Sequence, residues 1–343
     1  MRLKSFALSL LLLNLPALAA GQPAPRTLEV SANAAWKHAE SEMILPPTVD
    51  GLARAEIMDL TNEELDIVAN YGSERDGLWV TVYLYKTQIA NVPLWFDRAL
   101  TTIMLRPEYG LAGTAAPTPT AFIPPRASSA SGLRAVLDVN APNLRSTAVA
   151  IGPAAGFQLK IRISSASLDR AALDERLSRF IAGLRWPAEG TPPARAAVAI
   201  LPCPSPLRLR NARLVRVEVA DTLMDALGGI SLSDEERPAP VYCREPGPAN
   251  AAYGVYRADG SRDSYLIALN DAGIALSLQE AIDFGALTGR GNSGRRIAMT
   301  LLDREATAVM PSFNRLPPPE QAVQAAGAQG STISVSTRPG NRQ

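Results

Sequence analysis

The sequence predicts an α+β protein: an N-terminal antiparallel sheet with helices packed on it, in the manner of an α/β sandwich, followed by a smaller, β-rich α+β domain. Three observations predict this class. Segments in which apolar and polar residues alternate outnumber segments with helical spacing. The two clearest helical segments each follow a group of strands. A proline-rich stretch then precedes a second group of strands.

The composition divides the 343-residue chain into six segments. Its length, with 47% hydrophobic residues, is enough for two buried cores. The predicted order is a signal peptide at 1–20, a leading segment at 21–42, the α+β domain at 43–187, a linker at 188–206, the small β-rich domain at 207–328 and a disordered tail at 329–343.

The first residues, MRLKSFALSLLLLNLPALAAGQ, have the parts of a secretory signal peptide. Arg2 and Lys4 precede a short apolar run, and small residues mark a cleavage site near Ala19 or Ala20. The run is shorter than the roughly 20 residues that a membrane-spanning helix needs. The sequence therefore predicts a periplasmic or secreted protein with no transmembrane segment in the mature chain.

The first domain is expected to begin with strands from about Met43. In the strand containing LWVTVYLYK, the alternation places Trp79, Tyr83 and Tyr85 on one side and the aliphatic residues on the other. The next segment, NVPLWFDRALTTIML, has apolar residues at helical spacing behind Asn91, which is a suitable N-cap.

Two more strands form a predicted hairpin around Gly152–Gly156. Its second arm, FQLKIRIS, alternates cleanly, which predicts that its apolar residues point inward and that Gln158, Lys160 and Arg162 point outward. The segment SLDRAALDERLSRFIAGLRW then predicts an amphipathic helix with Ser167 as its cap.

The second domain is predicted from strands in ARLVRVEV, PVYCRE, AAYGVYRADGSRDSYLIALN, GIALSL and RRIAMTLLDREATAVMPSF. Short helices are expected at 221–228 and in PPPEQAVQAAG. Asp259, Ser261 and Asp263 have the alternate spacing of a calcium loop. No glutamate closes that loop, so a hairpin turn is the better interpretation.

The segment GRGNSGRR at 289–296 contains the G-x-G-x-x-G spacing of dinucleotide-binding loops. Such a loop follows a strand and opens a helix. Here the glycines follow irregular or helical composition and precede an alternating segment. The sequence therefore predicts a turn at this position and no nucleotide cofactor.

The charge balance argues against nucleic-acid binding. The chain has 34 basic and 33 acidic residues, a formal charge of +1 that becomes −1 when Arg2 and Lys4 are removed. Contacts to phosphates require a surplus of positive charge. No nucleic-acid partner is expected.

Cys203 and Cys243 are the only cysteines. In an exported protein, such a pair predicts a structural disulfide. Two free thiols or a redox pair are the alternatives. The wide spacing lacks the CxxC proximity that tunes a reactive thiol.

His38, the only histidine, lies in a polar leading segment and is expected to be solvated. One histidine and two cysteines cannot complete a tetrahedral zinc site without carboxylates, and any serine or cysteine triad would have to use His38. The sequence therefore predicts no metal site, no cofactor and no catalytic residue of these kinds.

Two functions remain. The sequence favours a non-enzymatic, exported binding or envelope-associated protein whose partner is an unknown protein or envelope component. Trp79, Tyr83 and Tyr85 form its possible binding face, although the same row could be core beneath the helices. The alternative is a carboxylate-based enzyme acting on cell-wall glycans, with Asp303 and Glu305 on one face of a strand.

Overall fold

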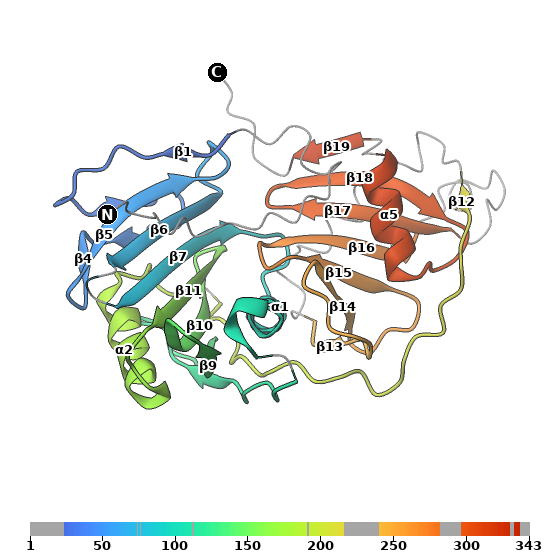
Figure 1. The fold of residues 1–343 in the computed structure, drawn as a ribbon. Helices are drawn as coiled ribbons and strands as arrows, with labels where there is room; N and C mark the ends of the chain where they lie inside the picture. Colours follow the sequence, from blue (N-terminus) through green and yellow to red (C-terminus); the bar gives the residue numbers. More distant parts are fainter. Residues whose placement is uncertain are drawn as a thin grey trace, which may run out of the picture.

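A computed structural model describes residues 24–73, 75, 77–111, 113–190, 192–215, 240–281, 296–329 and 333–336. The fold is mixed α+β and dominated by antiparallel sheet, which confirms the α+β part of the prediction (Figure 1). The predicted signal peptide, the helix expected at 221–228 and the glycines of the G-x-G-x-x-G segment lie outside the described residues.

The first sheet has nine strands in the order β1-β5-β6-β7-β11-β10-β9-β8, with β4 paired to β5. The strands are β1 (Arg26–Thr27), β4 (Thr48–Val49), β5 (Leu52–Asp59), β6 (Asp66–Ser73), β7 (Leu78–Lys86), β8 (Thr120–Phe122), β9 (Gly132–Ala141), β10 (Leu144–Ala154) and β11 (Phe157–Ser165). The predicted hairpin is β10–β11, which turns at Ala155–Gly156 with both residues at positive φ. The clean alternation of β11 therefore sits at the centre of the sheet.

The leading segment belongs to the fold, so the expectation that ordered structure starts near Met43 is wrong. It contains β1 and β2 (Trp36–Lys37), and β2 pairs with β3 (Ile44–Leu45). The buried guanidinium of Arg54 donates hydrogen bonds to the carbonyl oxygens of Ser31, Ala34 and Leu45. Because these carbonyls are partly shielded from water, the arginine holds a polar segment that has little apolar surface of its own.

Two helices belong to the first half of the chain. In α1 (Val92–Met104), the Asn91 side chain accepts a hydrogen bond from the Leu94 N–H at 3.0 Å, which confirms the predicted cap. In α2 (Arg170–Gly183), the cap is Asp169 and the prediction of Ser167 is wrong. The carbonyl oxygen of Ser167 is already held by Arg145 of β10, and the helix therefore starts later.

The aliphatic faces of β7 and β11 form one buried cluster with α2. The helix contributes Leu173, Leu177, Phe180 and Ile181, and the two strands contribute Leu78, Val80, Val82, Leu84, Phe157, Leu159, Ile161 and Ile163. This is the inward face that the alternation predicts.

The second sheet has eight strands in the order β12-β18-β17-β16-β15-β14-β13, with β19 paired to β18. They are β12 (Leu214–Val215), β13 (Tyr242–Arg244), β14 (Tyr253–Ala258), β15 (Tyr265–Leu269), β16 (Ile274–Glu280), β17 (Ile297–Asp303), β18 (Ala306–Phe313) and β19 (Ile333–Ser336). The predicted helix near residue 320 is α5 (Pro319–Gln329). Strand β19 falls inside the tail that was expected to be disordered, so that expectation is wrong for these four residues.

Helix α1 lies between the two sheets (Figure 1). Its apolar residues share one buried cluster with β9 and β10 on one side and with β14, β15, β16 and β17 on the other. Its Arg98 is also buried and donates hydrogen bonds to the carbonyl oxygens of Asn250, Ala251 and Asn270. Apolar packing and hydrogen bonds through α1 therefore both hold the two sheets together.

Candidate functional site

Strand β7 places the three predicted binding residues on the same face, but burial rises along the strand. Trp79 is 38% exposed, Tyr83 is half-buried and Tyr85 is 1% exposed. The cross-strand neighbours of Trp79 are Gly72 and Ser164, and residues this small cannot cover an indole. Trp79 is therefore accessible to a ligand.

Tyr85 lies beneath the second sheet. Its ring packs edge-on against Trp95 of α1, with 6.5 Å between ring centroids. Gly273, in the β15–β16 turn, approaches so closely that a Cβ there would lie 2.8 Å from the Tyr85 ring. Burial raises the pKa of Tyr85 well above its ordinary value, and the charges of Asp271 and Asp66 raise it further. Tyr85 is core, so only Trp79 and Tyr83 of the row remain available.

Tyr83 is held in place by a cation. The Nζ atom of Lys160 lies 4.4 Å from the Tyr83 ring centroid, which is within cation–π range. Lys160 also donates to the Asp271 carboxylate at 2.9 Å. The expectation that Gln158 and Lys160 point into solvent is wrong, since the second sheet covers this end of β11.

A row of polar side chains crosses the same face beside the aromatic residues. The Asn70 amide donates to Glu56 Oε1 at 3.2 Å, and the Thr81 hydroxyl donates to Asn70 Oδ1 at 3.1 Å. Farther along the row, Arg162 donates to the Tyr109 hydroxyl at 3.3 Å. Because these groups already hydrogen-bond to one another, their orientations are fixed before any ligand binds.

Charged side chains from the hairpin turns of the second sheet close the other end of this face. The Arg304 guanidinium lies 2.7 Å from the Asp66 carboxylate and 2.8 Å from Asp303. Lys86 forms ion pairs with both Glu40 and Glu305. We call this set of interactions, together with Lys160–Asp271, the charged seam.

The pKa values of two aspartates in the charged seam, Asp66 and Asp271, shift in opposite directions. Burial raises the pKa of Asp66 above its ordinary value by more than the charge of Arg304 lowers it. Burial also acts to raise the pKa of Asp271, but the charge and hydrogen bond of Lys160 outweigh it, and the pKa lies below its ordinary value. The opposite shifts reflect how completely Arg304 compensates Asp66, and Lys160 compensates Asp271, for the hydration that each carboxylate loses on burial.

Asp303 and Glu305 do not share a strand face, so that part of the enzyme hypothesis is wrong. Asp303 ends β17, and Arg304 and Glu305 form the turn before β18. Each carboxylate has a basic partner, Arg304 for Asp303 and Lys86 for Glu305. Glu305 thus links the second sheet to β7 through Lys86, and Asp303 contacts Arg304, which in turn pairs with Asp66 of β6.

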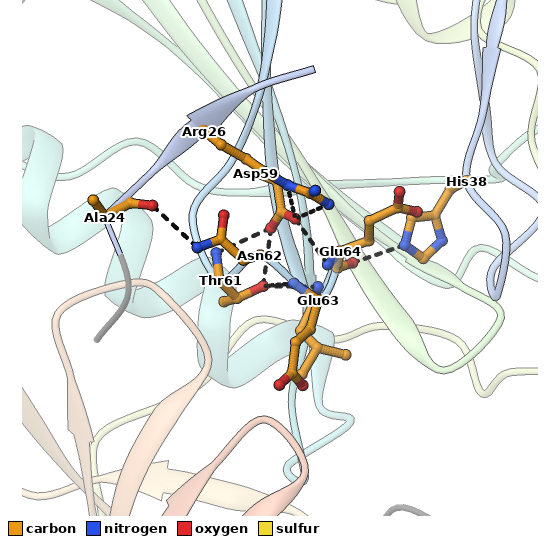
Figure 2. A network of polar contacts seen from close by, with 9 residues as sticks. Ala24, Arg26, His38, Asp59, Thr61, Asn62, Glu63 and Glu64 are labelled. Atoms are coloured by element: carbon orange, nitrogen blue, oxygen red, sulfur yellow. Dashed lines mark hydrogen bonds and ion pairs between the residues drawn. The ribbon is translucent and has the colours of Figure 1, made fainter. Parts of the chain in front are cut away.

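His38 is buried at 1% exposure, so the expectation of a solvated histidine is wrong. Its Nδ1 atom accepts a hydrogen bond from the Ser41 N–H at 2.9 Å, and its Nε2 atom lies 2.8 Å from the Glu64 carbonyl oxygen. A backbone N–H can only donate and a carbonyl oxygen can only accept, which fixes the neutral tautomer with the proton on Nε2. Figure 2 shows the contact with Glu64; with both nitrogens engaged, His38 has no free lone pair for a substrate.

Asp59 is the centre of the polar network beside His38 (Figure 2). One carboxylate oxygen accepts from the N–H and hydroxyl of Thr61, and the other accepts from Arg26 and the N–H of Glu64. Burial acts to raise the pKa of Asp59, but these hydrogen bonds outweigh it and lower the pKa. The network secures β1 and the β5–β6 turn and leaves no open position for chemistry.

The predicted disulfide is confirmed between Cys203 and Cys243. It links the segment before the second sheet to β13, beside a bridge between Pro202 and Arg244. Closing a loop over a sequence separation of 40 stabilises a fold by about 4 kcal/mol on the chain-entropy model. Its role is structural.

A pocket on the first half of the chain was missed by the sequence analysis. It has a volume of about 390 Å³ and is lined by Lys37, Glu42, Ile44, Pro125, Arg126, Leu184, Arg185, Trp186 and Pro187. A second pocket of about 170 Å³ shares Pro125, Arg126, Trp186 and Pro187 with it. The lining of the larger pocket comes from four separate segments of the chain, so no local sequence motif could have indicated it.

Within the described ranges, no group of three or more histidine, cysteine or acidic residues is placed to hold a metal ion. The helices of the same ranges include none with the length and apolar character to span a bilayer.

The chain matches no known family model, and comparisons with curated proteins and with solved structures give no match either. The function must therefore be argued from the geometry of the chain itself.

Proposed function

We propose that this is an exported, non-catalytic binding protein that contacts a component of the bacterial envelope through Trp79 and Tyr83. The observation that carries the proposal is the exposure of Trp79 on a strand whose other large side chains are buried or half-buried. Leaving an indole in water forgoes the hydrophobic free energy of its burial, and exposed aromatic residues are enriched at binding surfaces.

The neighbouring polar row supports a ligand with hydroxyl or amide groups. Thr81 lies between Trp79 and Tyr83 on β7, Asn70 lies opposite it on β6, and both side chains are already oriented by hydrogen bonds. An aromatic side chain can stack on the apolar face of a sugar ring while neighbouring polar side chains hydrogen-bond to the sugar hydroxyls. The Trp79 face therefore suits a sugar. An envelope glycan is the first candidate.

Export is the second part of the proposal. The signal peptide at 1–20, with cleavage near Ala19 or Ala20, directs the chain to the periplasm of a Gram-negative bacterium. The disulfide agrees with an oxidising compartment.

Two domains, 43–187 and 207–328, make up the mature protein in this proposal, with the leading segment packed on the first. Each has a hydrophobic cluster drawn only from its own residues, one around α2 and one around α5. The cluster around α1 and the charged seam join them. The first domain would carry the binding face, and the second would support this face by packing against Tyr85.

The carboxylate-based enzyme has less support. Asp303 and Glu305 both have basic partners, and neither lines the pockets around Arg126. A general acid needs a carboxyl that reaches the substrate.

The test uses the mature chain, without residues 1–20, and purified peptidoglycan with soluble glycan fragments as probes. Trp79→Ala should weaken binding by roughly tenfold or more, about the 1.4 kcal/mol or more expected for a buried aromatic anchor. Leu105→Ala is the matched control, because Leu105 is also 38% exposed but lies at the end of α1. Equal binding by both variants, or turnover of the glycans, would contradict the proposal.

A further inference from the structure

The pocket around Arg126 and Trp186 combines apolar walls with an excess of positive charge. Ile44, Pro125, Leu184, Trp186 and Pro187 supply hydrocarbon surface, and Lys37, Arg126 and Arg185 supply cations. Its volume of about 390 Å³ falls in the range of pockets that hold small organic ligands. It lies apart from the Trp79 face, since the two share no residue.

The one acidic side chain in the lining does not neutralise the arginines. Glu42 is paired with Lys37 at 2.7 Å. The hydrogen bond and charge of Lys37 lower the pKa of Glu42, and Arg126 adds a smaller contribution in the same direction. Glu42 therefore stays ionised beside Lys37, and two guanidinium groups remain in excess.

The guanidinium groups of Arg126 and Arg185 have N–H donors that no described residue accepts from. Arg126 gives one hydrogen bond to the Trp186 carbonyl oxygen at 3.3 Å. The side chain of Arg185 has no hydrogen-bond or ion-pair partner among the described residues. An arginine offers five N–H donors in a planar fork, the geometry that matches a carboxylate.

The backbone around these arginines is well anchored. Arg185 exchanges two backbone hydrogen bonds with Ile44, at 3.0 and 3.3 Å. The indole N–H of Trp186 donates to the Ile181 carbonyl oxygen at 3.0 Å. The pocket walls are thus set by the fold, and only the arginine side chains must be ordered when a ligand binds.

We propose that this pocket binds a carboxylate attached to an apolar body, with Arg126 and Arg185 on the carboxylate and with Trp186 and the prolines on the apolar part. The adjoining pocket of about 170 Å³ extends the same walls beyond Arg126 and gives room for a longer ligand. The chemistry is shared by small organic acids and by the C-terminus of a peptide.

The experiment measures binding to the mature protein by titration calorimetry with two pairs of probes. One pair is 3-phenylpropionate and its amide, and the other is N-acetyl-Ala-Ala-Phe with a free C-terminus and the same peptide amidated. Both acids should bind more tightly than their amides, and added salt should weaken the acids because the arginines are exposed. A preference for the peptide acid identifies a peptide C-terminus, and a preference for the small acid identifies a free metabolite.

Variants assign the binding to the two arginines. Arg126→Ala/Arg185→Ala should weaken the acids by roughly tenfold or more and leave the amides unchanged. Arg208→Ala/Arg210→Ala removes the same charge at two exposed positions outside the pocket and should have no effect. Arg185→Gln alone, which removes no contact among the described residues, should also weaken the acids without lowering the thermal midpoint.

Three results would overturn the inference. They are equal binding of acid and amide, equal losses in the pocket and control variants, or no binding of either acid at millimolar concentration. Trp79→Ala should leave carboxylate binding intact. A failure of this site is therefore distinguishable from a failure of the proposed envelope-binding face.

Discussion

The two faces of strands β7 and β11 are buried by different chemistry. On one face, Val82, Leu84 and Ile161 share a hydrocarbon cluster with α2. On the other, the charged seam covers Tyr85 and Lys160 with ion pairs and hairpin turns of the second sheet. Each hydrocarbon contact stabilises the folded state, whereas the attraction within a buried ion pair must first offset the hydration that both charges lose. The α2 face should therefore stabilise the fold, and the charged seam should specify how the sheets meet.

The largest effect is expected on the α2 face. Phe180→Ala removes a fully buried ring that packs edge-on against Tyr71, with 5.3 Å between centroids. The free energy of unfolding should fall by about 4 kcal/mol, from lost transfer free energy and a residual cavity. Urea unfolding measures the change. A loss below about 1 kcal/mol would show that this face is not the dominant core.

The charged seam should respond to single and double changes in different ways. Arg304→Met leaves the buried Asp66 carboxylate without its ion-pair partner and should cost about 3 kcal/mol. The double variant Asp66→Leu/Arg304→Met removes both charges and should return to within about 1 kcal/mol of the wild-type protein. Urea unfolding of the wild-type protein, Arg304→Met, Asp66→Leu and the double variant completes the cycle. A double variant as unstable as the single one would mean that the seam supports the fold as strongly as α2 does.

The sequence predicts the α2 face well because its signal is local. The alternation in FQLKIRIS and the spacing of the helix stripe each specify a face within ten to fifteen residues. The seam depends on pairs far apart in sequence, such as Asp66 with Arg304, which no periodicity connects. Lys160 was placed outward correctly with respect to its own sheet, and only the position of the second sheet makes that face buried.

The candidate sites also differ in whether local sequence or distant segments of the chain determine them. Alternation placed Trp79, Tyr83 and Tyr85 on one face, but the exposure of Trp79 and the burial of Tyr85 depend on the second sheet. The disulfide followed from counting cysteines in a chain predicted to be exported. The pocket at Arg126 and Arg185 could not be found, because its lining is assembled by the fold from distant segments.

A smaller effect should appear as a pH dependence of the seam. Because the folded-state pKa of Asp271 lies below its ordinary value, its stabilisation is present above about pH 4 and is lost as the pH falls through the folded-state pKa. Asp271→Asn should therefore cost about 2 kcal/mol at neutral pH, and the difference from the wild-type protein should shrink in acid. Urea unfolding of both proteins between neutral and acidic pH measures it.

Asp66 provides the control of opposite sign. Because burial raises its folded-state pKa, the stability linked to its protonation is greatest below about pH 4 and is lost as the pH rises through the folded-state pKa. Relative to Asp66→Asn, the wild-type protein should thus lose stability as the pH rises. Parallel curves for the two aspartates would contradict the assignment of opposite shifts.

The smallest effects are expected from the aromatic row. The buried Tyr85 hydroxyl has no hydrogen-bond partner among the described residues, so Tyr85→Phe removes a cost and keeps the ring against Trp95. The free energy of unfolding should stay constant or rise by about 1 kcal/mol. Trp79→Ala should cost clearly less than Phe180→Ala, about 1 kcal/mol, because Trp79 stays 38% exposed in the folded protein. If Trp79→Ala instead destabilised the protein by as much as Phe180→Ala, Trp79 would belong to the core, and the binding role of this face would lose its basis.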